Sequence, residues 1–391
     1  MVSSGQPHRY KNLETNVIKL VIMEKERIDL MISDIMIPKN SSLGKLIAMK
    51  KVHEKQGAKK ITILGAGSMG IALSILLGRN GHETILWTPF ADEAELLNLE
   101  RGHKERMPGV LLPTEVHCLT DFDMAVKDAE IIVFAVPSQN ARHTCQRLKL
   151  CLENRGVSAE SIIVSCSKGI DSDTCKLISE VIFEEVPKMN VCVLSGPSYA
   201  IEIAKGFPTA VVCASVDRDI AVKVQDTFMN NNFRVYTSDD VMGVELAGAL
   251  KNVIALCAGI SEGMGFQNNT RAALITRGMV EITRLGTKMG ARMETLTGLA
   301  GMGDIILTCT GDYSRNRKAG ILIGEGCSVD TAIKKVNMVV EGVAASEPAY
   351  RLAQKYQVEM PIITMAYEII HNNKDPREAV VELMERGKRD E

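Results

Sequence analysis

The segment that begins at Ile61 reads Ile-Thr-Ile-Leu-Gly-Ala-Gly-Ser-Met-Gly-Ile-Ala-Leu. It joins a short β-branched run to a G-x-G-x-x-G turn and to the start of an amphipathic helix. In such a turn Gly65 allows a sharp bend, Gly67 allows the backbone to approach a diphosphate, and Gly70 lets the helix lie close to the strand. A second β-rich run, 84–87, follows at the spacing of a βαβ unit. This context favours a dinucleotide-binding turn over a purely structural glycine turn.

Short β-rich runs alternate with helical patterns from Ile61 to about Ser238. The runs cover residues 61–64, 84–87, 131–136, 162–166, 191–194, 210–213 and 234–236. This alternation predicts a doubly wound, mostly parallel sheet with helices on both faces. After Asp240 the β-rich runs stop and helical periodicity takes over, as in 270–290, where Arg277, Glu281, Arg284 and Lys288 share one helical face and apolar residues point elsewhere. We therefore expect an α/β domain over 59–240 and an all-α domain over 241–391.

The 391-residue length leaves a segment, 1–58, that precedes the predicted α/β domain. It mixes charged, amide-bearing and Met-rich stretches and carries no recognisable chemistry. We expect it to be an N-terminal extension of unknown role. Met49 is an alternative start of the chain, which N-terminal sequencing of the native protein would refute by finding residues upstream of it.

Charge and cysteine usage exclude several classes of protein. The 46 Lys and Arg nearly cancel the 48 Asp and Glu, so no bulk field attracts nucleic acid or an anionic membrane, and any anion site must be local. Ten cysteines without a C-x-x-C pair fit neither a disulfide scaffold nor a zinc ribbon, and no spacing indicates a metal site. The uncharged stretch 61–78 is interrupted by glycines, which argues against a membrane span. We expect a cytoplasmic protein without a metal, a nucleic-acid partner or an integral membrane segment.

Three segments carry polar groups that packing alone would not require. Lys168 follows a β-rich run and would project at the carboxyl edge of the sheet, where ligands bind in doubly wound folds; an exposed surface lysine is the alternative. Residues 195–199, Ser-Gly-Pro-Ser-Tyr, also follow such a run and could line a ligand or form a turn. Lys251 and Asn252 interrupt an otherwise apolar helical stretch. Burial there would lower the pKa of Lys251 toward the range useful for proton transfer, whereas a lysine that reaches solvent is the alternative.

A fourth segment is rich in glycine and ends at Asp304. Its sequence over 298–304, Gly-Leu-Ala-Gly-Met-Gly-Asp, can fix the carboxylate close to a cationic partner. The following run 314–317, Ser-Arg-Asn-Arg, supplies charged and neutral donors suited to a phosphate, although Arg315 and Arg317 could instead form a solvated helix face.

The preference between NAD and NADP stays open from these residues. An acidic residue at the end of the second strand would favour NAD, and a basic residue there would favour NADP. This chain has Thr88, Pro89 and Phe90 at that place, with Asp92 and Glu93 slightly later.

At this point the chain resembles the bacterial-type NAD(P)-dependent sn-glycerol-3-phosphate dehydrogenases, nearly collinearly from about Lys60 to Glu391. The shared motifs are GAGSMG at 65–70, SKGI at 167–170, SGPSYA at 195–200, LKN at 250–252, GLAGMGD at 298–304, LTC at 307–309, SRNR at 314–317 and VVEG at 339–342. The resemblance implies a Rossmann domain followed by a helical domain, with NAD or NADP as cofactor. It also implies the reversible reduction of dihydroxyacetone phosphate to sn-glycerol 3-phosphate, for glycerophospholipid synthesis, and makes a homodimer plausible. Pro89 departs from the polar or basic residue that the family often has there.

The resemblance also implies roles for individual residues. Lys251 matches the catalytic lysine, with Lys168 and Asp304 as its partners. The matched substrate contacts are Lys168, Gly196, Ser198, Lys251, Asn252, Asp304, Thr308, Ser314, Arg315 and Asn316. The matched cofactor contacts include the three glycines of the turn. They are Gly65, Gly67, Ser68, Met69, Gly70, Lys168, Ala200, Arg315, Val339 and Glu341. By this resemblance Lys251 exchanges a proton with the substrate oxygen, while Arg315 and Asn316 hold the phosphate.

Two other functions fit part of the pattern. A β-hydroxyacid dehydrogenase of similar architecture would act on a carboxylate substrate, but the Ser-Arg-Asn-Arg run and the 298–304 segment argue against it. A non-catalytic NAD(H)-sensing protein would not need Lys168, Lys251 and Asp304 beside the nicotinamide.

Overall fold

The computed structural model describes residues 57–154 and 156–388. Within these residues a sheet of eight strands forms, in the order β3-β2-β1-β4-β5-β6-β7-β8. The strands are β1 Lys60–Leu64, β2 Glu83–Trp87, β3 Val116–Leu119, β4 Ile131–Phe134, β5 Ile162–Ser165, β6 Asn190–Ser195, β7 Thr209–Ala214 and β8 Phe233–Ser238. All neighbouring pairs are parallel except β6 with β7, which pair antiparallel. The predicted doubly wound, mostly parallel sheet is confirmed, with the strand order of a Rossmann fold over its first six strands.

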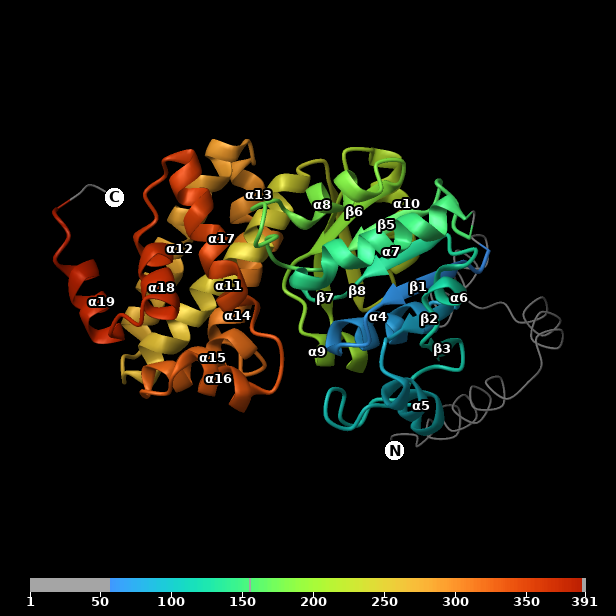
Figure 1. The fold of residues 1–391 in the computed structure, drawn as a ribbon, viewed down its shortest axis with the longest axis horizontal. Coiled ribbons are helices and arrows are strands. Elements are labelled where there is room, and N and C mark those ends of the chain that lie inside the picture. The colour runs from blue at the N-terminus through green and yellow to red at the C-terminus, as the bar shows by residue number, and fades with distance from the viewer. Residues whose placement is uncertain (1–56, 155, 389–391) are drawn as a thin grey trace, which may run out of the picture. The chain divides into compact units, whose positions relative to one another are not determined.

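Helices cover both faces of this sheet (Figure 1). They are α4 Ser68–Arg79, α5 Ala91–Glu100, α6 Phe122–Val126, the 3₁₀ turn η1 Ser138–Asn140, α7 Ala141–Glu153, α8 Ile178–Glu185, α9 Ala200–Lys205 and α10 Arg218–Phe228. One buried cluster joins α4, α5, α9 and α10 to one face, and a second joins α6, α7 and α8 to the other. The β-branched strands are buried on both faces, as a parallel sheet requires.

From Val241 onward the described chain is helical. Its elements are α11 Val241–Gly263, α12 Asn268–Met289, α13 Met293–Thr297, the π-helical turn η2 Leu299–Gly303, α14 Asp304–Thr310, α15 Arg315–Gly324, α16 Val329–Val336, α17 Glu341–Tyr356, α18 Pro361–His371 and α19 Pro376–Met384. The predicted all-α region after the sheet is confirmed. Helix α11 is long and apolar enough to cross a membrane, but 83% of its most apolar window is buried inside the protein.

Glycines let α11 and α15 approach closely. A Cβ atom on Gly259 would lie 2.1 Å from the carbonyl oxygen of Arg317, and a Cβ atom on Gly320 would lie 2.2 Å from that of Leu256. Both distances are shorter than any real contact, so larger residues would force the helices apart. This contact holds the first turns of α15 against the C-terminal half of α11, which follows Lys251 in the same helix.

Two features differ from the sequence prediction. Strand β3, Val116–Leu119, is an edge strand that the β-rich runs did not include. In α12, Arg277, Arg284 and Lys288 are exposed as their shared face predicts, but Glu281 is only 2% exposed. Its carboxylate accepts hydrogen bonds from the backbone N–H groups of Ile362 and Ile363 at the start of α18. Glu281 is buried because it caps a neighbouring helix.

Candidate active site

Two predicted site segments lie at the carboxyl ends of neighbouring strands. Lys168 follows β5, and Gly196 and Ser198 follow β6. The Nζ atom of Lys168 donates to the carbonyl oxygen of Gly196 at 3.1 Å, and the hydroxyl of Ser198 donates to the same oxygen at 2.8 Å. Gly196 has φ +142°, a backbone conformation that favours glycine. The edge of the sheet therefore directs the Lys168 ammonium toward the helical region.

Asp304 joins the two predicted lysines. Its Oδ1 atom lies 2.5 Å from Nζ of Lys251 in α11, and its Oδ2 atom lies 2.6 Å from Nζ of Lys168. Lys251 also donates to the hydroxyl of Thr308 at 2.8 Å. Asp304 is the first residue of α14, directly after the π-helical turn 299–303. The lysine in the apolar helix is thus buried with partners and does not reach solvent.

The turn before Asp304 depends on glycine. A Cβ atom on Gly301 would lie 1.7 Å from the carbonyl oxygen of Leu296, so no other residue fits there. Single π-helical turns are rare and often occur at functional sites. Here the turn sets the position of the Asp304 carboxylate between the two ammonium groups.

Burial and charge act in opposite directions on this cluster. Burial lowers the pKa of Lys251 to about 8, although Asp304 opposes the shift and Lys168 adds to it. Burial alone would raise the pKa of Asp304, but Lys168 and Lys251 outweigh that effect and keep it below its usual value. The carboxylate is therefore ionised at neutral pH, and Lys251 can change protonation state near neutral pH.

The predicted phosphate-facing run begins helix α15. Ser314 is its N-cap, and its hydroxyl oxygen accepts from the backbone N–H of Arg317. The side-chain amide of Asn316 donates to Asn252 Oδ1 at 2.9 Å, and its own Oδ1 accepts from the backbone N–H of Gly342 at 2.9 Å. These contacts tie α15 to the helix that carries Lys251 and to the first turn of α17.

The two arginines of that run have different surroundings. Arg317 donates two hydrogen bonds to Glu262, at 2.8 and 2.7 Å. Within 57–154 and 156–388, Arg315 has no hydrogen-bond or ion-pair partner. Burial lowers the pKa of its guanidinium, Glu341 opposes that shift, and Arg106 adds to it. Arg315 is the cation of the run that is available to an anionic ligand, whereas Arg317 is already paired.

Glu341 occupies a position that its motif did not reveal. Its carboxylate accepts from the backbone N–H of Ser138 at 3.2 Å and from the Ser138 hydroxyl at 2.6 Å. Ser138 follows β4 in the α/β region, while Glu341 begins α17. Sequence reasoning missed Ser138, because a serine after a strand has no distinguishing pattern without its partner. Val339, two residues earlier, is 41% exposed.

The glycine-rich turn has the shape that a dinucleotide needs. Gly65 has φ +107°, and a Cβ atom there would lie 2.9 Å from the carbonyl oxygen of Ala135. A Cβ atom on Gly70 would lie 1.8 Å from the Gly65 carbonyl oxygen, whereas nothing lies within 4 Å of one on Gly67. Ser68 and Met69 form the first turn of α4, whose N–H groups have no helical partner. The residues present fit a diphosphate at this helix N-terminus.

The residues predicted to contact the cofactor come from several elements. Ala200 begins α9 after the Ser195–Tyr199 turn, and it packs against the same buried cluster as α4. Of the described residues, no group of three or more His, Cys, Asp or Glu side chains is arranged to hold a metal ion.

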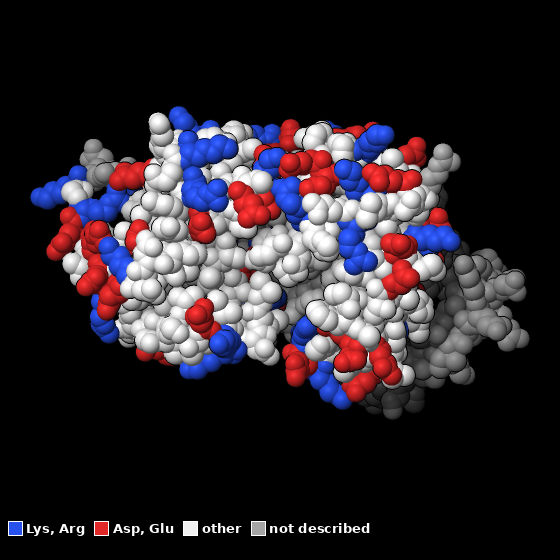
Figure 2. All heavy atoms as spheres, in the orientation of Figure 1, with Lys and Arg blue, Asp and Glu red and all other residues white. Residues whose placement is uncertain are grey.

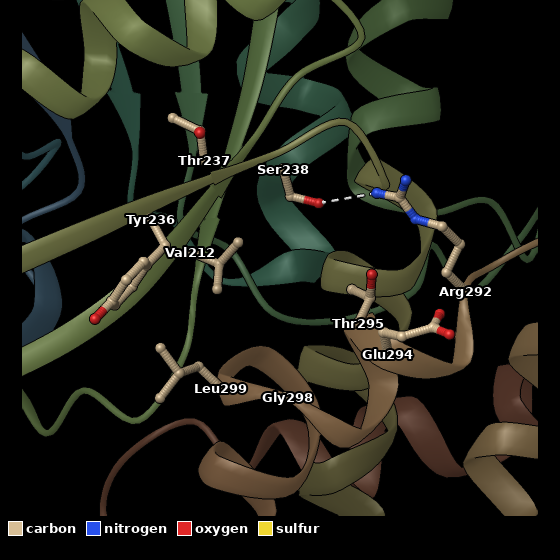
Figure 3. Close-up of a pocket in the computed structure, with 9 residues that line it drawn as sticks. All are labelled: Val212, Tyr236, Thr237, Ser238, Arg292, Glu294, Thr295, Gly298 and Leu299. Atoms are coloured by element: carbon tan, nitrogen blue, oxygen red, sulfur yellow. Dashed lines mark hydrogen bonds between the residues drawn. The ribbon is translucent and has the colours of Figure 1, made fainter.

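A separate pocket lies beside the start of the 299–303 turn (Figure 3). Its volume is about 450 Å³. The lining residues are Val212, Tyr236, Thr237, Ser238, Arg292, Glu294, Thr295, Gly298 and Leu299. None of them belongs to the predicted site, and in Figure 3 the Arg292 guanidinium is turned toward the hydroxyl of Ser238, with a donor to oxygen distance of 3.4 Å. This pocket is therefore distinct from the Lys251–Asp304 cluster.

Comparison with known proteins gives the same family over both halves. Residues 60–221 match the model of the NAD-dependent glycerol-3-phosphate dehydrogenase N-terminus, and residues 240–381 match the model of its C-terminus. The chain belongs to the NAD-dependent glycerol-3-phosphate dehydrogenase family. The predicted family is confirmed. The prediction that the chain is an oxidoreductase that uses NAD or NADP is confirmed as well.

Individual relatives extend this family match over nearly their whole length. A glycerol-3-phosphate dehydrogenase [NAD(P)+] of Lysinibacillus sphaericus is 48% identical over 336 residues, which are 85% of this chain and 98% of the relative. One from Clostridium acetobutylicum is 46% identical over 331 residues, 85% of this chain and 98% of the relative. The crystal structure of glycerol-3-phosphate dehydrogenase from Coxiella burnetii has a TM-score of 0.80 at 37% identity, covering 84% of this chain and 99% of that one. The family fold therefore spans the described α/β and helical regions together.

Proposed function

We propose that this chain reversibly reduces dihydroxyacetone phosphate to sn-glycerol 3-phosphate with NADH or NADPH, and that Lys251 exchanges the proton. The observation that carries the proposal is the buried cluster of Lys251, Asp304 and Lys168. Lys251 is only 6% exposed, has a pKa lowered to about 8 by burial, and keeps Asp304 at 2.5 Å. A general acid works best when its pKa lies near the operating pH.

Each residue of the cluster has a separate role in this proposal. A nicotinamide cofactor, held through its diphosphate at the glycine-rich turn, would supply the hydride for reduction of the substrate carbonyl carbon and would accept it in the reverse direction. Lys251, as an ammonium, donates a proton to the oxygen that becomes the hydroxyl, and as a neutral amine it removes that proton in the reverse direction. Asp304 holds Lys251 and Lys168 in place through its two oxygens. Lys168 adds a positive charge where negative charge develops on the substrate oxygen.

The phosphate end of the substrate would bind at the start of α15. Arg315 is an unpaired cation of the described chain, and the first N–H groups of α15 favour an anion. Asn316 and Asn252, linked by a hydrogen bond of 2.9 Å, fix the distance between this end and Lys251. Ser198, Thr308 and Ser314 would add neutral contacts. Binding the phosphate far from the reacting carbon would hold the ketone in position.

The remaining parts of the proposal concern the context of the enzyme. We place it in the cytoplasm, where its product would enter glycerophospholipid synthesis, and we expect a homodimer. The α/β domain is assigned to 59–240 and the helical domain to 241–391, with 1–58 as an N-terminal extension that lies outside the described residues up to 56.

A substrate comparison tests the function. The purified full-length chain is mixed with NADH or NADPH, and the loss of reduced cofactor absorbance is followed with dihydroxyacetone phosphate or with a β-keto acid. We expect NADH or NADPH to be oxidised when dihydroxyacetone phosphate is added and not when the β-keto acid is added. Oxidation with the acid alone would identify a β-hydroxyacid dehydrogenase, and cofactor binding without turnover would identify a sensing protein.

The variant Lys251→Ala tests the role of the lysine in the same assay. We expect turnover to fall by at least about 100-fold, because acid–base groups contribute about that much or more. Cofactor affinity should stay nearly unchanged, since Lys251 contacts Asp304 and Thr308 and not the glycine-rich turn. A variant with near-normal turnover would refute the assignment.

A further inference from the structure

A polar chain of contacts links the end of β2 to the glycine-rich turn. Thr88, the residue after β2, is 1% exposed, and its hydroxyl donates to Oε2 of Glu93 at 2.5 Å. Glu93 lies in the first turn of α5, and its other oxygen is paired with the guanidinium of Arg106. Arg106 also donates to the carbonyl oxygen of Ala66 at 2.8 Å, inside the turn. In a Rossmann fold this is where the adenosine ribose of the cofactor binds.

The charges at this place differ from those of an NADP site. The residues directly after β2 are Thr88, Pro89 and Phe90, so no cation stands where a 2′-phosphate is usually bound. Arg106 is the nearby cation, but Glu93 neutralises it, and the side chains are 34% and 12% exposed. A phosphate brought here would meet a mostly buried carboxylate and a guanidinium that is already paired.

From this arrangement we propose that Glu93 and Thr88 select NAD(H) against NADP(H) by presenting a carboxylate to the ribose hydroxyls. This inference rests on the proposed function for the identity of the cofactor. A carboxylate accepts a hydrogen bond from a ribose hydroxyl, as acidic residues at the end of the second strand do in NAD enzymes. The same carboxylate already neutralises Arg106, so a 2′-phosphate finds no free cation here, whereas the ribose hydroxyls find an acceptor. The selecting carboxylate comes from the helix after β2 and is held at the strand end by Thr88.

Binding without substrate tests the proposal. NADH and NADPH are titrated separately into the full-length protein, and the dissociation constants are measured from nucleotide fluorescence. We expect NADPH to bind at least about tenfold more weakly than NADH, because its 2′-phosphate lacks a free cation. Equal binding, or tighter binding of NADPH, would overturn the proposal.

The variant Glu93→Gln identifies the selecting group. Removing the negative charge releases Arg106, so the affinity for NADPH should rise by about tenfold while the affinity for NADH changes less than about threefold. Glu95→Gln is the matched control, since Glu95 lies on the same helix and is exposed. It should leave both dissociation constants unchanged. An unchanged ratio in the Glu93 variant would refute the role of Glu93.

A second variant covers the case in which Glu93→Gln does not fold. Arg106→Gln leaves the Glu93 carboxylate unpaired, so NADPH binding should weaken further relative to NADH binding, and stronger NADPH binding would contradict the proposal. A protein that prefers NADH but does not oxidise it with dihydroxyacetone phosphate would refute the proposed reaction and leave this preference standing. A protein that binds neither nucleotide would refute both.

Discussion

Two opposing effects set the protonation of Lys251. Burial lowers its pKa to about 8, while the carboxylate of Asp304 favours the charged form. The ammonium form therefore dominates below about pH 8 and the amine form above it. We expect kcat/KM for dihydroxyacetone phosphate reduction to fall as pH rises through about 8, and kcat/KM for the reverse oxidation to rise over the same range. Rate profiles measured in both directions between pH 6 and 10 check this.

The variant Asp304→Asn tests the cause of that profile. Without the carboxylate, burial and Lys168 both disfavour the ammonium, so the pKa of Lys251 should fall further. The fall in kcat/KM for reduction should therefore occur at a lower pH. Activity should also drop, because Asp304 no longer holds the two lysines in position. A fall that stays at its original pH would mean that another group titrates.

Arg315 and Arg317 provide a matched pair for the phosphate assignment. Arg315 has no partner among the described residues, whereas Arg317 is held by Glu262. Arg315→Ala should raise KM for dihydroxyacetone phosphate by about 10- to 100-fold, the loss expected for a hydrogen bond to a charged group. Arg317→Ala should leave KM nearly unchanged and lower thermal stability. Steady-state kinetics and thermal melting of the two variants separate these effects, and equal KM values would refute the assignment.

At the scale of elements, the sequence predicts most strands of the sheet, but it misses the edge strand β3 and the direction of the β6–β7 pairing. Seven strands follow from β-branched runs, because strands buried on both faces need such residues. The eighth, β3, reads Val-His-Cys-Leu; it has only one β-branched residue, and the exposed His117 interrupts its apolar residues, so it does not stand out as a β-rich run. The antiparallel pairing of β6 with β7 was also not predicted, since the direction of a strand leaves no trace in its own residues.

Glu281 shows why helical spacing alone misplaces a charged residue. Its position predicts a shared face with Arg284, but the free N–H groups at the start of α18 need an acceptor. Glu281→Ala should lower the free energy of unfolding by about 2–4 kcal/mol, because two buried donors lose their partner. Arg284→Ala, an exposed change on the same helix, should cost less than about 0.5 kcal/mol. Denaturant unfolding of both variants measures the difference.

The same carboxyl group makes stability depend on pH. Burial raises the pKa of Glu281 from 4.5 to about 7, so the folded state binds more protons than the unfolded state between these values. The contribution of Glu281 to stability is therefore greatest below about pH 4.5 and is lost as pH rises through 7, by up to roughly 3 kcal/mol. Glu281→Gln should flatten this slope. An equal slope in the wild type and the variant would assign it to other groups, such as Glu245, whose pKa is raised in the same way.

At the scale of the whole molecule, the site is assembled from segments far apart in the sequence. The resemblance predicted Lys168, Lys251 and Asp304 as site residues, but their meeting depends on the strand order and on the packing of α14 against α11. Contacts such as Glu341 with Ser138 join the two regions without any local pattern. Figure 2 shows both signs of charge intermixed around the margins of the visible face, with a largely uncharged centre, in keeping with the net charge of −2. Local pairing, and not a bulk field, therefore governs this site.

The relatives indicate how much of the chain the enzyme needs. The match to the Lysinibacillus sphaericus relative covers 98% of that protein with only 85% of this chain, and all predicted site residues lie after Gly57. A chain that starts at Lys59 should therefore keep its kcat/KM within about twofold and its melting temperature within about 3 °C, a stability change below about 1 kcal/mol. Both quantities are measured against the full-length chain in the same buffer. A loss of activity above tenfold, or aggregation of the shorter chain, would make residues 1–58 part of the working enzyme.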